Sequence, residues 1–73
     1  MEDKRHILLV EDDKYIINFI SMSLKKENYG FYIAKTVEEA ISLFYANRPD
    51  MVILDLGLPD GDGMDVLKAV REI

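Results

Sequence analysis

The stretch MVILDLGLPDGDG, residues 51–63, begins with four apolar residues, reaches an acid at Asp55 and then continues into a loop rich in glycine and proline. An unbroken apolar run of this length predicts a strand that other elements cover on both faces. A carboxylate joined directly to such a strand is costly to desolvate without partners. The sequence therefore places Asp55 at the end of a buried strand and favours a functional role for it.

Two similar runs precede it, residues 7–10 (ILLV) and 31–34 (FYIA), and helix-like segments separate the three runs. The first helix is expected from Lys14 to about Glu27, because apolar residues recur there on one broad helical face. They are Ile16, Ile17, Phe19, Ile20 and Leu24. Residues 28–30 (NYG) supply its stop signal.

A second helix is expected after Thr36, which forms a capping box as N-cap with Glu39 at position N3. This helix should end before Pro49, because a proline disfavours helical geometry in the residue that precedes it. Its expected apolar face consists of Val37, Ala40, Ile41 and Phe44.

A third helix is expected to begin near Asp62 or Gly63, with Leu67 and Val70 facing inward. The element order is then βαβαβα, and strands that helices separate cannot pair as hairpins. We therefore predict one α/β domain with a parallel sheet, right-handed crossovers and helices on the faces of the sheet.

Composition argues against several classes of function. Acidic residues outnumber basic ones by 14 to 9 and the net charge is -5, whereas a nucleic-acid surface needs clustered Lys and Arg. Cysteine is absent, which excludes disulfides, a thiolate nucleophile and a Cys-based metal site. No apolar stretch approaches the roughly 18 residues that span a bilayer, and the N-terminus lacks the apolar centre of a signal peptide. We expect a soluble cytoplasmic protein with no membrane partner.

Three acids are expected to meet at one edge of the sheet. In an open parallel sheet, binding sites lie beyond the carboxyl ends of the strands, where the strand order reverses. Glu11 and Asp12 follow the first strand and Asp55 ends the third, so their carboxylates converge if those strands are neighbours. Such carboxylates repel one another unless a cation is bound among them. Oxygen ligands without His or Cys favour Mg²⁺ over zinc.

Simpler interpretations of these acids stay open. Glu11 and Asp12 could merely complement the dipole of the following helix, and we expect Asp13 to act only as its cap. A calcium loop is disfavoured, because an EF-hand that starts at Asp55 would need oxygen ligands at Gly57 and Pro59. The sequence also lacks a glycine-rich phosphate-binding loop.

Two other residue types receive structural interpretations. His6 has no acidic or serine partner in a recognisable arrangement, so we expect it on the surface before the first strand. The aromatic residues of the helices, Phe19 and Phe44, are expected in the core.

The stretches ILLVEDD (residues 7–13) and DMVILDLGLPDGDGMDVLKAVR (residues 50–71) together resemble the receiver domain of two-component response regulators. The residues in these stretches are most similar to those of the winged-helix transcription-factor subfamily. The set is specific, because an acid pair follows the first strand, one Asp ends the third, and Pro59 and Gly63 stand four and eight residues after it. The resemblance implies a flavodoxin-like (CheY-like) sheet, here with strand order 2-1-3.

The resemblance also implies a role for each matching residue. Asp55 matches the aspartate that accepts a phosphoryl group from a sensor histidine kinase. Glu11 and Asp12 match the acidic pair that holds Mg²⁺ together with Asp55, and Gly57 matches the position whose backbone carbonyl is a further metal ligand. Pro59 and Gly63 match residues that shape the loop. Such a module is a signalling substrate and not a conventional enzyme.

The sequence departs from the family in length. A receiver has five βα units and residues 1–73 hold three, so we expect the N-terminal portion of a receiver domain. The two remaining units carry the Ser or Thr and the Lys that contact the phosphoryl group, and neither Lys14 nor Lys68 stands in an equivalent place. The third strand would then be an exposed edge that recruits a second copy of the chain. DNA binding would need a domain that is not in this sequence.

Two alternative functions remain. In the first, the chain is an inert half-domain that acts as an interaction module. The acids then only cap a helix and form a solvated surface. In the second, it is a Mg²⁺-dependent aspartyl-phosphate phosphatase. That enzyme would require a second Asp two residues after the nucleophile, where this sequence has Gly57.

Overall fold

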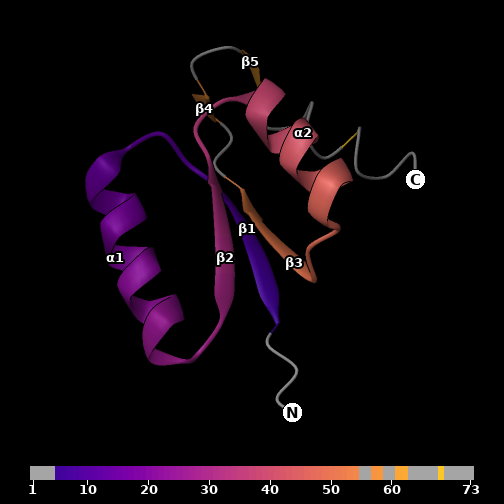
Figure 1. Cartoon of the computed structure of the whole chain (residues 1–73). Coiled ribbons are helices and arrows are strands. Elements are labelled where there is room, and N and C mark those ends of the chain that lie inside the picture. The colour runs from indigo at the N-terminus through magenta and orange to yellow at the C-terminus, as the bar shows by residue number, and fades with distance from the viewer. Residues whose placement is uncertain (1–4, 55–56, 59–60, 63–67, 69–73) are drawn as a thin grey trace.

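The fold was analysed on a computed structural model, which describes residues 5–54, 57–58, 61–62 and 68. Figure 1 shows the elements in chain order. They are β1 (His6–Val10), α1 (Lys14–Lys26), β2 (Gly30–Ala34), α2 (Val37–Asn47), β3 (Met51–Leu54), β4 (Gly57–Leu58) and β5 (Gly61–Asp62). The expected third helix lies almost wholly outside the described residues, of which Lys68 is helical and exposed.

The main sheet has three parallel strands in the order β2-β1-β3, as predicted. β1 is the central strand, and Val10 at its end lies opposite both Ala34 of β2 and Leu54 of β3. Residues 7–10 are buried because neighbouring strands flank β1 and helices cover both of its faces. The unbroken apolar run ILLV is thus explained by its central position.

α2 covers one face of the sheet and forms the main core. Four fully buried residues make the centre of this core: Leu8, Val10, Ala34 and Ala40. The partly buried residues packed around them are Tyr32, Val37, Leu43, Phe44, Val52 and Leu54. The prediction that Phe44 belongs to the core is confirmed. Ile41 is half-buried, and Leu43 rather than Ile41 packs against this cluster.

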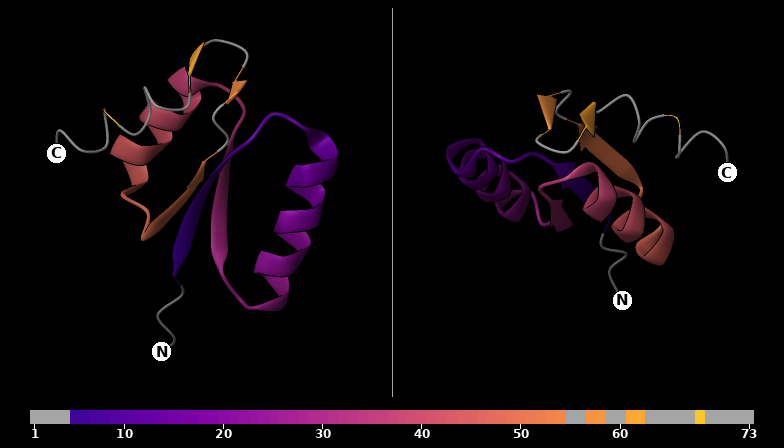
Figure 2. Two further views of the ribbon diagram at one scale, coloured as in Figure 1. Left: turned by 180° about the vertical axis from the view of Figure 1, so that it is seen from behind. Right: turned by 90° about the horizontal axis from the view of Figure 1, so that it is seen from above.

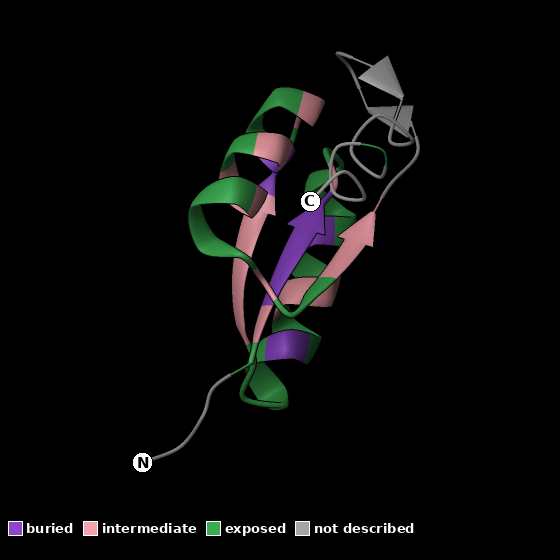
Figure 3. Cartoon of the chain, turned by 90° about the vertical axis from the view of Figure 1, so that its right-hand side faces the viewer, coloured by how far each residue is buried: buried purple, intermediate pink, exposed green. Residues whose placement is uncertain are grey.

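α1 covers the opposite face of the sheet, as the views in Figure 2 show. Its buried side chains are Ile17 and Leu24, which lie on the side of the helix that faces the strands. The prediction that Phe19 lies in the core is wrong, because 73% of this residue is exposed. The apolar residues of α1 extend around most of the helix, and of these only Ile17 and Leu24 are buried. Figure 3 shows buried residues along the central strand β1.

Both ends of α1 are fixed by local hydrogen bonds. At the start, the Asp13 carboxylate accepts hydrogen bonds from the backbone N–H groups of Tyr15 (2.8 Å) and Ile16 (3.3 Å). At the end, Asn28 adopts a left-handed conformation with φ 64°. The N–H of Tyr29 then donates to the Leu24 carbonyl at 2.9 Å, which forms a Schellman motif. The predicted cap and stop signal are both confirmed.

The predicted capping box of α2 is present with one difference. The Thr36 hydroxyl accepts a hydrogen bond from the Glu39 N–H at 3.1 Å, while the Glu39 carboxylate accepts one from the N–H of Lys35 at 2.8 Å and not from that of Thr36. α2 ends at Asn47, and Arg48 is left-handed with φ 46° immediately before Pro49. The helix therefore ends before the proline, as expected.

The amino ends of the strands are connected through His6 and Asp50. The His6 N–H donates to the Asp50 carboxylate at 2.8 Å, and the Asp50 N–H donates to the His6 carbonyl at 2.8 Å. The His6 ring stacks on Tyr32 at 5.7 Å between centroids and lies so close to Gly30 that a Cβ there would be 2.6 Å from it. His6 is half-buried and is the first residue of β1, so its placement before the strand on the surface was wrong.

Candidate functional site

The candidate site lies at the carboxyl ends of β1 and β3. These strands are parallel neighbours, with Val10 opposite Leu54, so their carboxyl ends lie at the same edge of the sheet. Glu11 follows β1 directly, and the residue after Leu54 in the sequence is Asp55. Asp55 itself lies outside the described residues.

Glu11 is anchored to the sheet through its backbone and to the next turn through its side chain. Its N–H donates to the Ala34 carbonyl at 2.9 Å, which continues the β1–β2 pairing by one residue. Its carboxylate accepts hydrogen bonds from the N–H groups of Asp12 (3.1 Å) and Asp13 (3.3 Å). The half-buried Glu11 side chain is therefore folded over the turn that leads into α1.

The three consecutive acids have three different environments. Glu11 is half-buried, Asp12 is exposed, and Asp13 is exposed but bound to the first turn of α1. Because the Asp13 carboxylate accepts hydrogen bonds from two backbone N–H groups, this residue is the N-cap of α1. The Glu11 carboxylate likewise accepts hydrogen bonds from two backbone N–H groups, and the exposed Asp12 stands between these two anchored acids.

The donor chemistry of this turn fits Mg²⁺. Carboxylate oxygens are hard ligands, and Mg²⁺ in proteins is held through one or two carboxylates, with water and phosphate oxygens as its other ligands. In the described part of the chain, no group of three His, Cys, Asp or Glu side chains could hold a metal. The third predicted ligand, Asp55, lies outside that part.

The loop after β3 contains an element that was not predicted from the sequence. β4 and β5 pair antiparallel, with Gly57 opposite Asp62 and Leu58 opposite Gly61. We expected an irregular turn at these residues, but Gly57 and Asp62 belong to two short paired strands. Pro59 and Gly63, the residues expected to shape this loop, lie outside the described residues.

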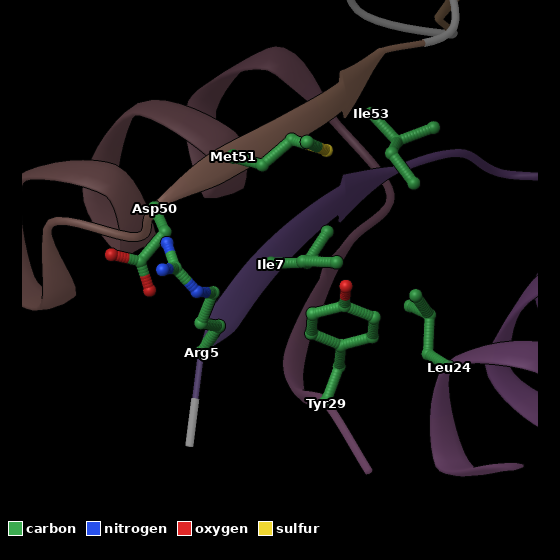
Figure 4. Close-up of a pocket in the computed structure, with 7 residues that line it drawn as sticks. All are labelled: Arg5, Ile7, Leu24, Tyr29, Asp50, Met51 and Ile53. Atoms are coloured by element: carbon green, nitrogen blue, oxygen red, sulfur yellow. The ribbon is translucent and has the colours of Figure 1, made fainter. Parts of the chain in front are cut away.

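A cavity of about 470 Å³ lies at the opposite ends of the same strands (Figure 4). Its lining consists of Arg5, Ile7, Leu24, Tyr29, Asp50, Met51 and Ile53. These residues surround the amino ends of β1 and β3 and the carboxyl end of α1, whereas the acids follow the carboxyl end of β1. The cavity is therefore separate from the candidate site.

A set of exposed apolar residues on α1 was also missed from the sequence. Tyr15 and Met22 were not singled out, and Phe19 was assigned to the core. Their separations of four and three residues place the three side chains on one side of a helix, which is the signal that could have identified them.

Comparison with known proteins identifies the family. Residues 7–73 match the family model of the response regulator receiver domain. The chain belongs to this family. Receiver domains are signalling modules of two-component systems, generally without enzymatic activity, that interact with histidine kinases and other partner proteins and typically bind Mg²⁺.

Solved receiver structures are similar to this one in fold and sequence. The non-phosphorylated HemR receiver domain from Leptospira biflexa is 40% identical with a TM-score of 0.88, over 94% of this chain and 56% of that one. A CheY-like receiver protein from Methanospirillum hungatei is 30% identical with a TM-score of 0.89, over 96% and 57%. The BeF₃-activated receiver domain of RstA from Klebsiella pneumoniae is 29% identical with a TM-score of 0.86, over 93% and 58%.

These matches also define how much of the fold is present. The chain spans little more than half the length of these three relatives. Its three-stranded parallel sheet of order 2-1-3 is therefore part of a CheY-like receiver fold. Among the helices of the described residues, none is long and apolar enough to cross a membrane.

Proposed function

We propose that residues 1–73 are the N-terminal portion of a receiver domain that accepts a phosphoryl group on Asp55 from a sensor histidine kinase. The observation that carries this proposal is the parallel pairing of β1 with β3, in which Leu54, the residue before Asp55, lies opposite Val10, the residue before Glu11. Membership of the receiver family supports it. The proposed Mg²⁺ ligands are the carboxylates of Glu11, Asp12 and Asp55 and the backbone carbonyl of Gly57.

The chemistry of this step depends on charge and position. A carboxylate is a weak nucleophile, so transfer requires in-line attack on phosphorus and neutralisation of the charge on the phosphoryl oxygens. An oxygen of Asp55 forms the new P–O bond, the P–N bond to the kinase histidine breaks, and the electron pair returns to the imidazole. Bound Mg²⁺ would supply the neutralising charge.

The product explains how such a module could signal. An acyl phosphate on Asp55 would carry about one more negative charge than the carboxylate it replaces. A charge change of this size can bias an element that has two alternative arrangements. The subfamily resemblance favours transcription as the regulated process, through a DNA-binding domain that is not in this sequence.

The proposal includes association through the edge of the sheet. β3 pairs only with β1 in the described sheet, and Met51 at its start is 57% exposed. An exposed strand edge with apolar side chains can pair with another chain. We therefore propose that a second copy of the chain pairs with β3.

Phosphorylation can be tested with acetyl phosphate as the donor. The protein is incubated with acetyl phosphate and Mg²⁺ and its intact mass is measured over time. We expect a gain of one phosphoryl group that disappears in Asp55→Asn and in the presence of a chelator. No gain in the unsubstituted protein would instead favour the inert interaction module.

Two neighbouring acids provide a matched control for the metal site. Asp12→Asn removes a proposed Mg²⁺ ligand, and we expect phosphorylation to slow by about tenfold or more, which corresponds to about 1.4 kcal/mol of lost transition-state stabilisation. Asp13→Asn keeps a good N-cap residue and should leave the rate within about twofold. Equal rates for the two variants would contradict the assignment of Asp12 to the metal.

A further inference from the structure

Lys35 lies at the same edge of the sheet as the acids of the candidate site. β1 and β2 are parallel (Figure 1), and the Glu11 N–H continues their pairing by donating to the Ala34 carbonyl at 2.9 Å. Glu11 and Lys35 are the next residues after the last paired ones, so they are neighbours across the two chains. Neighbouring strands are about 4.8 Å apart. We call the edge where β1 and β2 end, with Glu11 and Asp12 after β1, the acid edge.

The backbone of Lys35 is fixed by a variation of the capping box. In the ordinary box, the acid at position N3 accepts a hydrogen bond from the N–H of the N-cap residue. In α2 the Glu39 carboxylate reaches one residue further back and accepts one from the Lys35 N–H at 2.8 Å. This bond ties the chain after β2 to the first turn of α2. The Lys35 side chain therefore starts from a defined position at the acid edge.

The hydrogen bonds around Lys35 do not require its charge. The bond to Glu39 uses only the backbone N–H, which any residue except proline supplies. The residue is exposed. It precedes the N-cap Thr36, so its positive charge is at the end of α2 where the helix dipole favours anions. A residue that departs from such a local preference is expected at a functional site.

The other lysines of α1 and β2 are placed differently. Lys14 begins α1 near the acid edge, but its ammonium nitrogen lies 5.3 Å from the centre of the Tyr15 ring, which is exposed. A cation–π contact of this kind holds the charge at the aromatic ring. Lys25 is in the last turn of α1, at the opposite end of the helix. Among these lysines, Lys35 is the one that neighbours Glu11 across a strand pair.

A positive charge matters here because the proposed site and its phosphoryl donor are both anionic. The proposed ligands Glu11, Asp12 and Asp55 carry three negative charges and Mg²⁺ carries two positive ones, so negative charge is in excess. A phosphoryl donor such as acetyl phosphate is an anion and is repelled by this excess. A fixed cation at the same edge raises the local concentration of an anionic donor. The same cation repels Mg²⁺, because like charges close together oppose binding.

We propose that Lys35 attracts the anionic phosphoryl donor to the acid edge and weakens the binding of Mg²⁺ there. Lys35 is then a positioning residue and not a catalytic one. The inference rests on the proposed phosphorylation of Asp55. Loss of the lysine charge should raise the affinity for Mg²⁺ and lower the rate of phosphorylation, whereas damage to the fold would lower both.

Lys35→Gln tests the two effects separately. The affinity for Mg²⁺ is measured without a donor, from the backbone amide NMR shifts during a Mg²⁺ titration. We expect the substitution to lower the Kd for Mg²⁺ about threefold at low salt. The rate of phosphorylation is measured by intact mass with acetyl phosphate at saturating Mg²⁺, and should fall about threefold. Both differences should shrink as the salt concentration rises.

Two further variants serve as matched controls. Lys35→Arg keeps the positive charge, so both the Kd and the rate should stay within about 1.5-fold of the unsubstituted values. Lys25→Gln removes the same charge from the far end of α1, where salt screens it from the acid edge, and should also leave both values within about 1.5-fold.

Several results would overturn the proposal. Unchanged values in Lys35→Gln would show that Glu38 and Glu39, in the first turn of α2, neutralise the lysine. A fall in both affinity and rate would assign a structural role to Lys35, and equal effects in Lys25→Gln would assign the change to net charge. A change in only one of the two quantities would also contradict it. Absence of phosphorylation in the unsubstituted protein would instead refute the proposed function, and this inference with it.

Discussion

α1 and α2 cover opposite faces of one sheet (Figure 2), but they differ in how far apolar residues extend around each helix. α2 has acidic residues in its first turn, Glu38 and Glu39, and buries Ala40 against the sheet. α1 has basic residues in its last turn, Lys25 and Lys26, and carries large apolar side chains on both its inner and its outer side. Both charge distributions complement the helix dipole. Large apolar side chains are exposed at four positions of α1 and at one position of α2, which is Tyr45.

The two helices also pack differently. α2 approaches the sheet through a small residue, Ala40, which is completely buried among Leu8, Val10 and Ala34. α1 reaches the sheet through the longer side chains of Ile17 and Leu24, and a cavity of about 470 Å³ remains beside Leu24. The apolar residues of a helix therefore belong to two groups. Some pack against the sheet and stabilise the fold, and others are exposed and available for contact with another molecule.

The largest expected loss of stability comes from a substitution on the side of α1 that faces the sheet, compared with one on its exposed side. Ile17→Ala removes a buried side chain and should lower the free energy of unfolding by about 3 kcal/mol, because the lost contacts leave a cavity. Ile16→Ala changes the same residue type one position earlier, where the side chain is 43% exposed, and should cost less than about 1 kcal/mol. Urea unfolding followed by circular dichroism measures both values.

This pair is well matched, because both substitutions change helix propensity by the same amount. The difference between the two free energies therefore reports burial. Equal losses would show that α1 does not distinguish an inner side from an outer side, and the comparison between the helices would fail.

A smaller effect is expected from the caps of the two helices. Asp13→Ala and Thr36→Ala each remove an acceptor of backbone N–H groups, and each should lower the free energy of unfolding by about 1 kcal/mol. Asp12→Ala is the control, since its side chain does not cap α1, and it should change stability by less than about 0.5 kcal/mol. A loss in Asp12→Ala as large as that in Asp13→Ala would contradict the assignment of the cap.

These caps were also among the features that the sequence predicts best. The roles of Asp13, Thr36 and Glu39 depend on atoms within four residues along the chain, so local sequence is sufficient to identify them. The unbroken apolar run at residues 7–10 likewise indicated a strand covered on both faces, and β1 is buried. The same prediction for residues 51–54 was wrong at Met51, which is 57% exposed, because β3 is an edge strand of the described sheet. The strand order 2-1-3 was expected from the resemblance to receiver domains, and the pairing of β1 with β2 and β3 confirms it.

Features that depend on distant parts of the chain were missed. The position of His6 is determined by Gly30 and Tyr32, which are more than twenty residues away in sequence. Phe19 was assigned to the core because periodicity cannot identify the inner side of a helix whose apolar residues extend around most of its circumference. At the candidate site, Glu11 and Asp12 were expected where the structure has them, after β1, while the placement of Asp55 remains a prediction.

The smallest expected effect belongs to Phe19, on the exposed side of α1. Phe19→Ser should change the free energy of unfolding by less than about 0.5 kcal/mol, because the ring is 73% exposed and faces away from the sheet. The same urea titration measures it, with Ile17→Ala as the destabilised reference. A loss of about 2 kcal/mol or more would show that Phe19 belongs to the core after all. An unchanged stability would instead show that the fold does not depend on this large apolar residue.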